Sequence, residues 1–171
     1  MKWILVLCSL LWLTGCLGMP ETVKPVDKFE LERYTGKWYE IARLNHSFEE
    51  GLEQVTAEYI ATENEGIVVI NRGFDPIENE WQQAEGKAFM VSHSDIGHLQ
   101  VSFFGPFYSS YVIFDLDKEN YQYAYVSGPT EDYLWLLART PKVEAKIIER
   151  FVKSAQSRGF DTQQLIYVAH D

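Results

Sequence analysis

The strongest constraint on the fold of this chain is a series of short segments in which apolar and polar residues alternate. Residues 54–62, QVTAEYIAT, place Ala57 and Tyr59 on one face and Thr56 and Glu58 on the other. Such alternation is typical of β-strands with one buried face. Similar segments follow one another up to residue 139, separated by turn residues and without a helical pattern between them. Because the connections are short, neighbouring strands are expected to pair antiparallel.

About eight such segments occur, and a sheet of this size is stable once its two edge strands pair with each other. The sequence therefore predicts a mainly β fold, an eight-stranded up-and-down antiparallel β-barrel. The interior of such a barrel is just wide enough to hold one small ligand or to be packed solid with side chains. Both alternatives stay open here, although the small residues Ala57, Ala84, Gly86 and Ala88 favour a cavity.

The apolar period changes to that of a helix after residue 140. Thr140 is suited to cap this helix with Pro141 in its first turn, and Gly159 is suited to end it. The apolar residues between them fall on one stripe, so we expect a C-terminal α-helix packed on the outside of the barrel. A short additional strand, QLIYVA at residues 164–169, is expected to follow.

The first residues of the chain have the pattern of a targeting segment. A lysine precedes an apolar run, residues 3–13, that is too short to span a bilayer. The run ends in LTGC, residues 13–16, which resembles the lipobox of bacterial lipoproteins. In those proteins the cysteine sulfur receives a diacylglycerol group and the chain is cut just before it. The resemblance implies a signal peptide at residues 1–15 and lipidation of Cys16.

The lipoprotein resemblance also implies a location and a domain division. Leu17 stands where an aspartate would retain such a protein in the inner membrane, which implies an outer-membrane protein that faces the periplasm. Residues 16–28 contain two prolines and little apolar periodicity, and we interpret them as the lipidated N-terminus and a tether. Residues 29–171 are then the barrel domain.

Charge and cysteine content exclude several classes of function. The net charge of −10 makes nucleic acid a poor partner, and no basic cluster would attract anionic headgroups. Membrane attachment would therefore depend on the lipid at Cys16. The other cysteine, Cys8, lies within the predicted signal peptide, so no disulfide and no free thiol is expected in the mature chain.

Three motifs resemble those of the lipocalin family. Gly36-Lys37-Trp38 begins the first strand, the segment TEDY at residues 130–133 precedes the last strand, and Arg139 ends it. Longer blocks such as VSFFGPFY resemble the bacterial branch, whose members are outer-membrane lipoproteins. The resemblance implies a structural signature of Gly36, Trp38 and Arg139, in which Trp38 plugs the closed end of the barrel. The guanidinium of Arg139 would cover its indole.

Strand parity predicts which residues line the cavity. Tyr133 and Trp135 share the parity of Arg139 and are expected to point inward. In the segment 121–126, either the odd-numbered tyrosines or Gln122, Ala124 and Val126 face inward, and the sequence does not decide between them. The predicted ligand-binding residues are Ala57, Tyr59, Val69, Asn71, Ala84, Ala88, Met90, Val101, Phe103, Tyr111, Tyr133 and Trp135.

The lipocalin resemblance implies a protein that stores or transports fatty acids or lysophospholipids in the cell envelope. No nucleophile motif or paired carboxylates in a cleft suggest an enzyme, and no cofactor is expected. The alternatives are a structural or interaction lipoprotein of the envelope, a carrier of another hydrophobic ligand such as haem, and a homodimer. The histidines are not spaced as metal ligands and are expected to be solvated: His46, His93, His98 and His170.

Overall fold

A computed structural model describes residues 18–64, 66–91 and 93–171 of the chain. The predicted signal peptide and Cys16 lie outside the described residues. A short helix, α1 (Leu31–Tyr34), precedes the strands, and a longer helix, α2 (Ala145–Gln156), follows the first eight. The strands are β1 (Gly36–Arg43), β2 (Glu53–Ala61), β3 (Ile67–Asp75), β4 (Glu80–Met90), β5 (His98–Ser102), β6 (Ser109–Leu116), β7 (Tyr123–Ser127), β8 (Leu134–Ala138) and β9 (Ile166–Tyr167).

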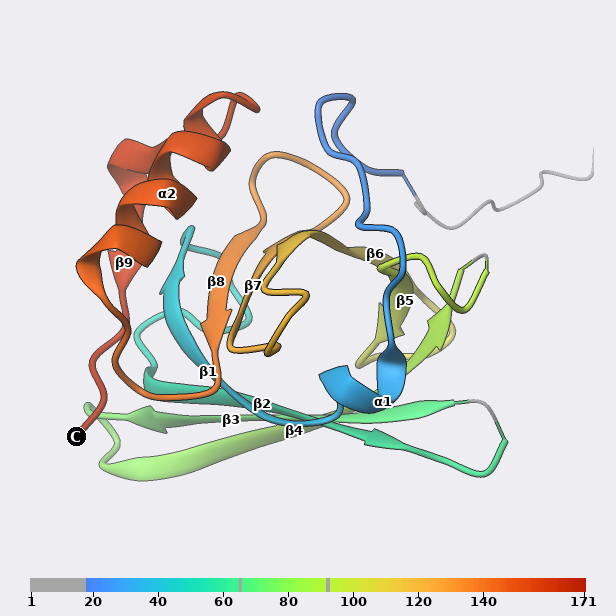
Figure 1. The fold of residues 1–171 in the computed structure, drawn as a ribbon. Coiled ribbons are helices and arrows are strands. Elements are labelled where there is room, and N and C mark those ends of the chain that lie inside the picture. The colour runs from blue at the N-terminus through green and yellow to red at the C-terminus, as the bar shows by residue number, and fades with distance from the viewer. Residues whose placement is uncertain (1–17, 65, 92) are drawn as a thin grey trace, which may run out of the picture.

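The first eight strands form a closed antiparallel barrel (Figure 1). Each strand pairs with the next along the chain, from β1 to β8, and β8 pairs back onto β1. This confirms the up-and-down barrel predicted from the alternation. The short strand β9 pairs with β1 at Ala42 and Arg43, on the side of the barrel that α2 also covers.

Helix α2 packs on the outside of the barrel, as predicted (Figure 1). Phe151 and Ala155 are fully buried, and the ring of Phe151 lies 5.1 Å from that of Tyr125 on β7. The predicted helix start was wrong, because the helix begins at Ala145. The hydroxyl of Thr140 donates to the carbonyl of Lys142 instead of capping a helix, and Glu144 is still extended. The helix stops before Gly159, which has a φ of +91°.

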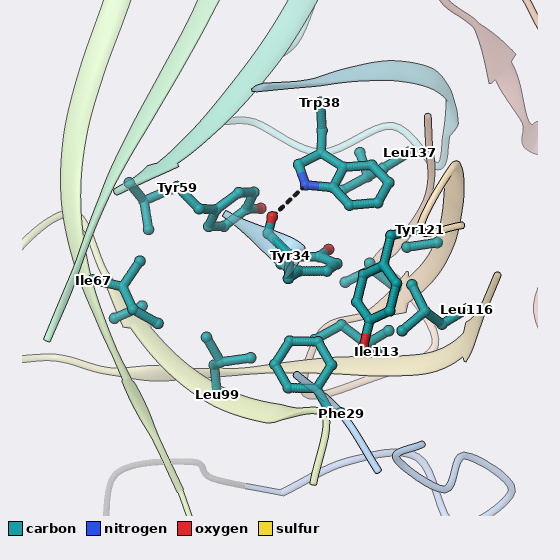
Figure 2. Packing of buried hydrophobic residues seen from close by; sticks show 14 residues of the cluster. Phe29, Tyr34, Trp38, Tyr59, Ile67, Leu99, Ile113, Leu116, Tyr121 and Leu137 are labelled. Carbon is teal, nitrogen blue, oxygen red and sulfur yellow. Dashed lines mark hydrogen bonds between the residues drawn. The ribbon is translucent and has the colours of Figure 1, made fainter. Parts of the chain in front are cut away.

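Buried side chains form one cluster inside the barrel and a second one between the barrel and α2. Within β7, Ala124 and Val126 belong to the inner cluster, whereas Tyr123 and Tyr125 point outward beneath α2. Tyr121, just before β7, also belongs to the inner cluster. This answers the question that the sequence left open for β7. Figure 2 shows the inner cluster, in which the indole nitrogen of Trp38 donates to the carbonyl of Tyr34 at 2.8 Å.

The N-terminal segment that we interpreted as a tether is packed against the barrel from Met19 onward. Val23 is buried in the outer cluster, and the hydroxyl of Thr22 donates to the carbonyl of Arg158. The amide of Val26 donates to Ile113, and the carbonyl of Val26 accepts from Gly97. The apolar contacts of Met19, Val23 and Val26, together with these backbone hydrogen bonds, hold residues 19–28 against the barrel. Within the described ranges, no helix combines the length and apolar character needed to cross a membrane.

Candidate functional site

A cavity of about 550 Å³ occupies one half of the barrel interior. The loops that join β1 to β2, β5 to β6 and β7 to β8 border it, so its mouth lies at that end of the barrel. Three phenylalanines on these loops, Phe48, Phe104 and Phe107, line the cavity and are 63%, 70% and 77% exposed. They form an apolar rim around the entrance.

Most of the residues predicted to face the cavity line its wall. Ala88 and Met90, by contrast, lie in or against the packed inner cluster and are absent from the lining. They occupy the end of β4, where Ala88 pairs with Ile67 and Met90 pairs with Leu99 in the filled half of the barrel. The ten that line the cavity are Ala57, Tyr59, Val69, Asn71, Ala84, Val101, Phe103, Tyr111, Tyr133 and Trp135.

The three signature residues meet at the closed end of the barrel. The guanidinium carbon of Arg139 lies 3.9 Å from the centre of the Trp38 ring. Arg139 also donates to the carbonyls of Arg33 at 2.7 Å and Lys37 at 2.9 Å. Burial lowers the pKa of Arg139, although the guanidinium stays charged. Gly36 adopts a φ of +90°, which favours glycine, at the turn that leads into β1.

The hydroxyls of Tyr59 and Tyr111, which line the cavity, form a hydrogen-bonded group with the buried hydroxyl of Tyr34. The hydroxyl of Tyr59 donates to that of Tyr111 at 2.7 Å, and the hydroxyls of Tyr34 and Tyr111 are 2.8 Å apart. Burial raises the pKa of all three groups, so they remain neutral hydroxyls. Tyr59 and Tyr111 therefore give a mostly apolar and aromatic wall a small polar region.

A buried charged cluster that the sequence analysis missed also lies at the cavity wall. Arg43 donates to the Glu40 carboxylate at 2.7 Å, and both side chains are almost inaccessible. The His46 Nε2 lies 3.1 Å from the Glu49 carboxylate, which also accepts from the indole nitrogen of Trp135 at 3.3 Å. Glu40, His46 and Glu49 all line the cavity, whereas Arg43 lies behind them.

The two carboxyl groups of this cluster titrate differently. Burial, followed by the nearby charge of Glu49, raises the pKa of Glu40 well above its usual range, and Arg43 offsets this only in part. Burial also acts to raise the pKa of Glu49, but the hydrogen bond and charge of His46 outweigh it and lower that pKa. The pKa values of the two neighbouring carboxyl groups are therefore shifted in opposite directions.

Three of the four histidines differ from their expected solvated positions. His46 belongs to the charged cluster, and its side chain is 6% exposed. His98 is buried, its Nε2 lies 3.0 Å from the Ser110 hydroxyl, and burial lowers its pKa. The Nε2 of His170 lies 2.7 Å from the Glu40 carbonyl, whereas His93 is exposed. Within residues 18–64, 66–91 and 93–171, no three histidine, cysteine or acidic side chains gather as a metal site.

A closed eight-stranded barrel with a hollow apolar end and a Gly-x-Trp turn at its packed end defines a ligand-binding barrel. The family model of the lipocalin-like domain matches residues 29–170. This chain belongs to the lipocalin family.

Among curated proteins, the chain is similar to outer membrane lipoprotein Blc of Vibrio cholerae, with 62% identity over 96% of this chain and 95% of that protein. Blc of Escherichia coli K12 is 46% identical over 87% of this chain and 84% of that protein. Among solved structures, insecticyanin of the tobacco hornworm is 20% identical, with a TM-score of 0.72 over 90% of this chain and 87% of that one. Lobster apocrustacyanin A1 is 16% identical, with a TM-score of 0.65 over 89% of this chain and 93% of that one.

Proposed function

We propose that this protein binds single-chain lipids, fatty acids or lysophospholipids, and stores or carries them in the bacterial envelope without catalysing a reaction. The observation that supports the proposal is the cavity of about 550 Å³, open at one end and lined mainly by apolar and aromatic residues. Its volume falls within the range of small-molecule sites. Burying an acyl chain there would contribute roughly 0.8 kcal/mol per methylene before the cost of ordering the chain.

We further propose that the protein is anchored in the outer membrane through Cys16 and faces the periplasm. The LTGC sequence and the similarity to outer membrane lipoprotein Blc support this. Because the chain is packed on the barrel from Met19 onward, only residues 16–18 would separate the lipid from the folded domain. Fully extended, three residues span about 10 Å, so the barrel would stay close to the membrane surface.

The binding proposal is tested by filling the cavity. Ala57 lines the cavity on β2, and Ala57→Phe would place a ring in the space of the acyl chain. We expect saturable binding of a lysophospholipid, followed by tryptophan fluorescence, to weaken by at least about tenfold. The matched control is Ile60→Phe, which enlarges a side chain on the outer face of the same strand and should leave binding unchanged.

Two results would contradict this binding proposal. One is a folded protein that binds no single-chain lipid at any concentration. The other is an Ala57→Phe variant that binds as tightly as the wild type while its unfolding transition is intact.

The anchoring proposal is tested by Cys16→Ser in the full-length chain expressed in a Gram-negative host. We expect the variant to appear in the soluble fraction, whereas the wild type stays with outer membranes. Identical fractionation of the two proteins would refute lipidation of Cys16.

A further inference from the structure

Two neutral polar groups on the cavity wall, the hydroxyl of Tyr111 and the amide of Asn71, have no role in holding a plain acyl chain. We propose that they form a subsite for a hydroxyl group carried by the acyl chain of the ligand. The preferred ligands would be single-chain lipids that are hydroxylated away from their headgroup. This inference rests on the proposed function and deepens it, because it selects among single-chain lipids by their chains.

The hydrogen-bonded tyrosines hold one more hydrogen than they use. Tyr59 donates to Tyr111 at 2.7 Å, and the hydroxyls of Tyr34 and Tyr111 share one hydrogen bond at 2.8 Å. Within the described part of the chain, these are the hydrogen bonds that the three hydroxyls make. Each hydroxyl brings one hydrogen, so one of the three donors remains unpaired.

The unpaired hydrogen is assigned to the hydroxyl of Tyr111. If Tyr111 donated to Tyr34, the free hydrogen would lie on Tyr34, which is fully buried in the packed inner cluster. An unpaired donor is costly in such a place. If Tyr34 donates instead, Tyr111 accepts two hydrogen bonds and keeps its own hydrogen. Tyr111 lines the cavity and is only partly buried, so a ligand oxygen can accept that hydrogen.

Asn71 adds a second polar group beside these tyrosines. On β3 it pairs with Ala57 of β2 and Ala84 of β4, and Tyr59 is the next inward residue after Ala57. Its amide oxygen is buried and makes no hydrogen bond within the described ranges of the chain. An amide offers donors and an acceptor, and a hydroxyl group can both donate and accept. A ligand hydroxyl therefore suits Asn71 as well as the free hydrogen of Tyr111.

These groups lie well below the mouth of the cavity. Tyr59 lines the cavity and is also buried in the packed inner cluster, so it lies where the hollow half meets the filled half. It is six residues along β2 from Glu53, which follows the β1–β2 loop, and six residues of a strand span about 20 Å. A lipid that enters tail first therefore brings its acyl chain to this position and leaves its headgroup near the mouth.

The subsite suits a neutral oxygen and not a charged one. Burial raises the pKa of Tyr59 and Tyr111, so both stay neutral hydroxyls. A carboxylate or phosphate would lose its hydration here and find few donors in exchange, which costs far more for a charged group than for a neutral one. An unmodified chain would cover the Tyr111 hydrogen and the Asn71 amide without pairing them. Hydroxylated chains would therefore bind more tightly than plain chains.

The test compares saturated fatty acids of one chain length, followed by tryptophan fluorescence. The hydroxyl group lies beside the carboxyl group, in the middle of the chain or near its far end, and the parent acid has none. We expect an acid with a mid-chain or far-chain hydroxyl to bind the wild type about tenfold more tightly than the parent acid. Because a hydroxyl makes the chain more polar, the hydrophobic effect alone would weaken its binding.

A pair of double variants locates the effect. Tyr59→Phe combined with Tyr111→Phe removes both hydroxyls from the cavity wall, keeps the rings and should abolish the gain. Tyr123→Phe combined with Tyr167→Phe removes two hydroxyls from the outside of the barrel and should retain it. Asn71→Leu should reduce the gain. Unchanged binding of the parent acid by the first double variant would show that the cavity is intact.

A second pair of lipids distinguishes a hydroxyl on the chain from one in the headgroup. Monoacylglycerol carries hydroxyls in its headgroup, and the methyl ester of the same fatty acid carries none. Since the headgroup stays near the mouth, we expect their affinities to agree within about threefold. A larger advantage of monoacylglycerol that disappears in the Tyr59→Phe and Tyr111→Phe double variant would overturn the assignment of the subsite to the chain.

The outcomes separate this inference from the function on which it rests. The subsite would be overturned, and lipid binding left in place, by equal or weaker binding of every hydroxylated acid. A gain confined to the hydroxyl beside the carboxyl group, or one that survives in the Tyr59→Phe and Tyr111→Phe double variant, would overturn it too. The wild-type series decides the question even if a variant fails to fold. Failure of every single-chain lipid to bind would overturn both proposals.

Discussion

Single residues close the packed end of the barrel, and others place charged groups at the wall of its hollow end. Arg139 joins the α1 turn to the barrel, because it stacks on Trp38 and donates to carbonyls on both sides of that turn. The indole of Trp38 completes the arrangement by donating to Tyr34. These contacts involve a charged donor that is partly buried, so each contributes more than an exposed hydrogen bond would.

Replacing Arg139 should therefore destabilise the fold. For Arg139→Met we expect the free energy of unfolding in urea to fall by about 3 kcal/mol, from lost charged hydrogen bonds and the lost stacking contact. The control is Arg150→Met, which removes an exposed arginine 5.6 Å from the ring centre of Tyr123 and should cost less than about 0.5 kcal/mol. Equal effects of the two substitutions would contradict the role given to Arg139.

The raised pKa of Glu40 predicts a dependence of stability on pH. A carboxyl whose pKa is raised in the folded state contributes stability below its unfolded value of 4.5, and this is lost as the pH rises toward the folded value. We expect Glu40→Gln, which mimics the protonated form, to remove this decline, which begins above the unfolded value of 4.5. The measurement is the difference in unfolding free energy between variant and wild type as a function of pH. The lowered pKa of His98 changes stability with pH in the opposite direction, but His98 is present in both proteins, so its effect cancels in this difference. A difference that does not change with pH would contradict the assignment.

The alternation of apolar and polar residues along the strands predicted most of the residues of the cavity wall, but it did not predict the charged cluster there. Glu40 shares the parity of Trp38, so its inward position could have been inferred from the sequence. Arg43 could not, because a bulge between Glu40 and Ala42 shifts the register of β1 and turns Arg43 inward. Glu49 lies in a loop, where strand parity gives no information.

At the scale of elements, the strands were easier to predict than the ends of the helix and the N-terminal segment. The apolar stripe identified α2 because its period is long and regular. Its start was misplaced because Thr140 can satisfy its hydroxyl locally, without a helix. Residues 19–28 were interpreted as a tether because they show little apolar periodicity. Their contacts are to residues distant in the sequence, such as Ile113 and Arg158, and a local sequence pattern does not reveal such contacts.

The contact of α2 with β7 should carry much of the stability of the outer cluster. Phe151 is completely buried there, so we expect Phe151→Ala to lower the free energy of unfolding by about 3–5 kcal/mol. Lys153→Ala changes an exposed residue of the same helix and should have an effect below about 0.5 kcal/mol. A loss below about 1 kcal/mol for Phe151→Ala would mean that α2 contributes little to the fold.

The whole molecule is a barrel with a filled half and a hollow half. Large side chains such as Trp38 and Leu99 fill the closed end, whereas small ones such as Ala57 and Ala84 leave room near the mouth. The closed barrel could be predicted from the sequence because every strand repeats the same pattern. The boundary between the two halves could not, since Ala88 has the same size and parity as Ala84 and yet lies in the packed half.

Because the cavity exists only in the folded barrel, we expect a single-chain lipid bound there to stabilise the fold. A ligand that binds only the folded state, at about 100 times its dissociation constant, should add about 2.7 kcal/mol to the free energy of unfolding. We expect a matching rise of the thermal transition with lysophospholipid, and a smaller rise for Ala57→Phe. An equal rise in both proteins would place the lipid outside the cavity.

The most direct test of the central claim is quenching of tryptophan fluorescence by a lysophospholipid with a brominated acyl chain. Trp135 lines the cavity, whereas Trp81 packs beside Arg72 and Phe74 and lies outside the cavity lining. We predict saturable quenching at one lipid per chain that persists in Trp81→Phe and is largely lost in Trp135→Phe. Quenching that disappears with Trp81 and survives the loss of Trp135, or that never saturates, would contradict a lipid held inside the barrel.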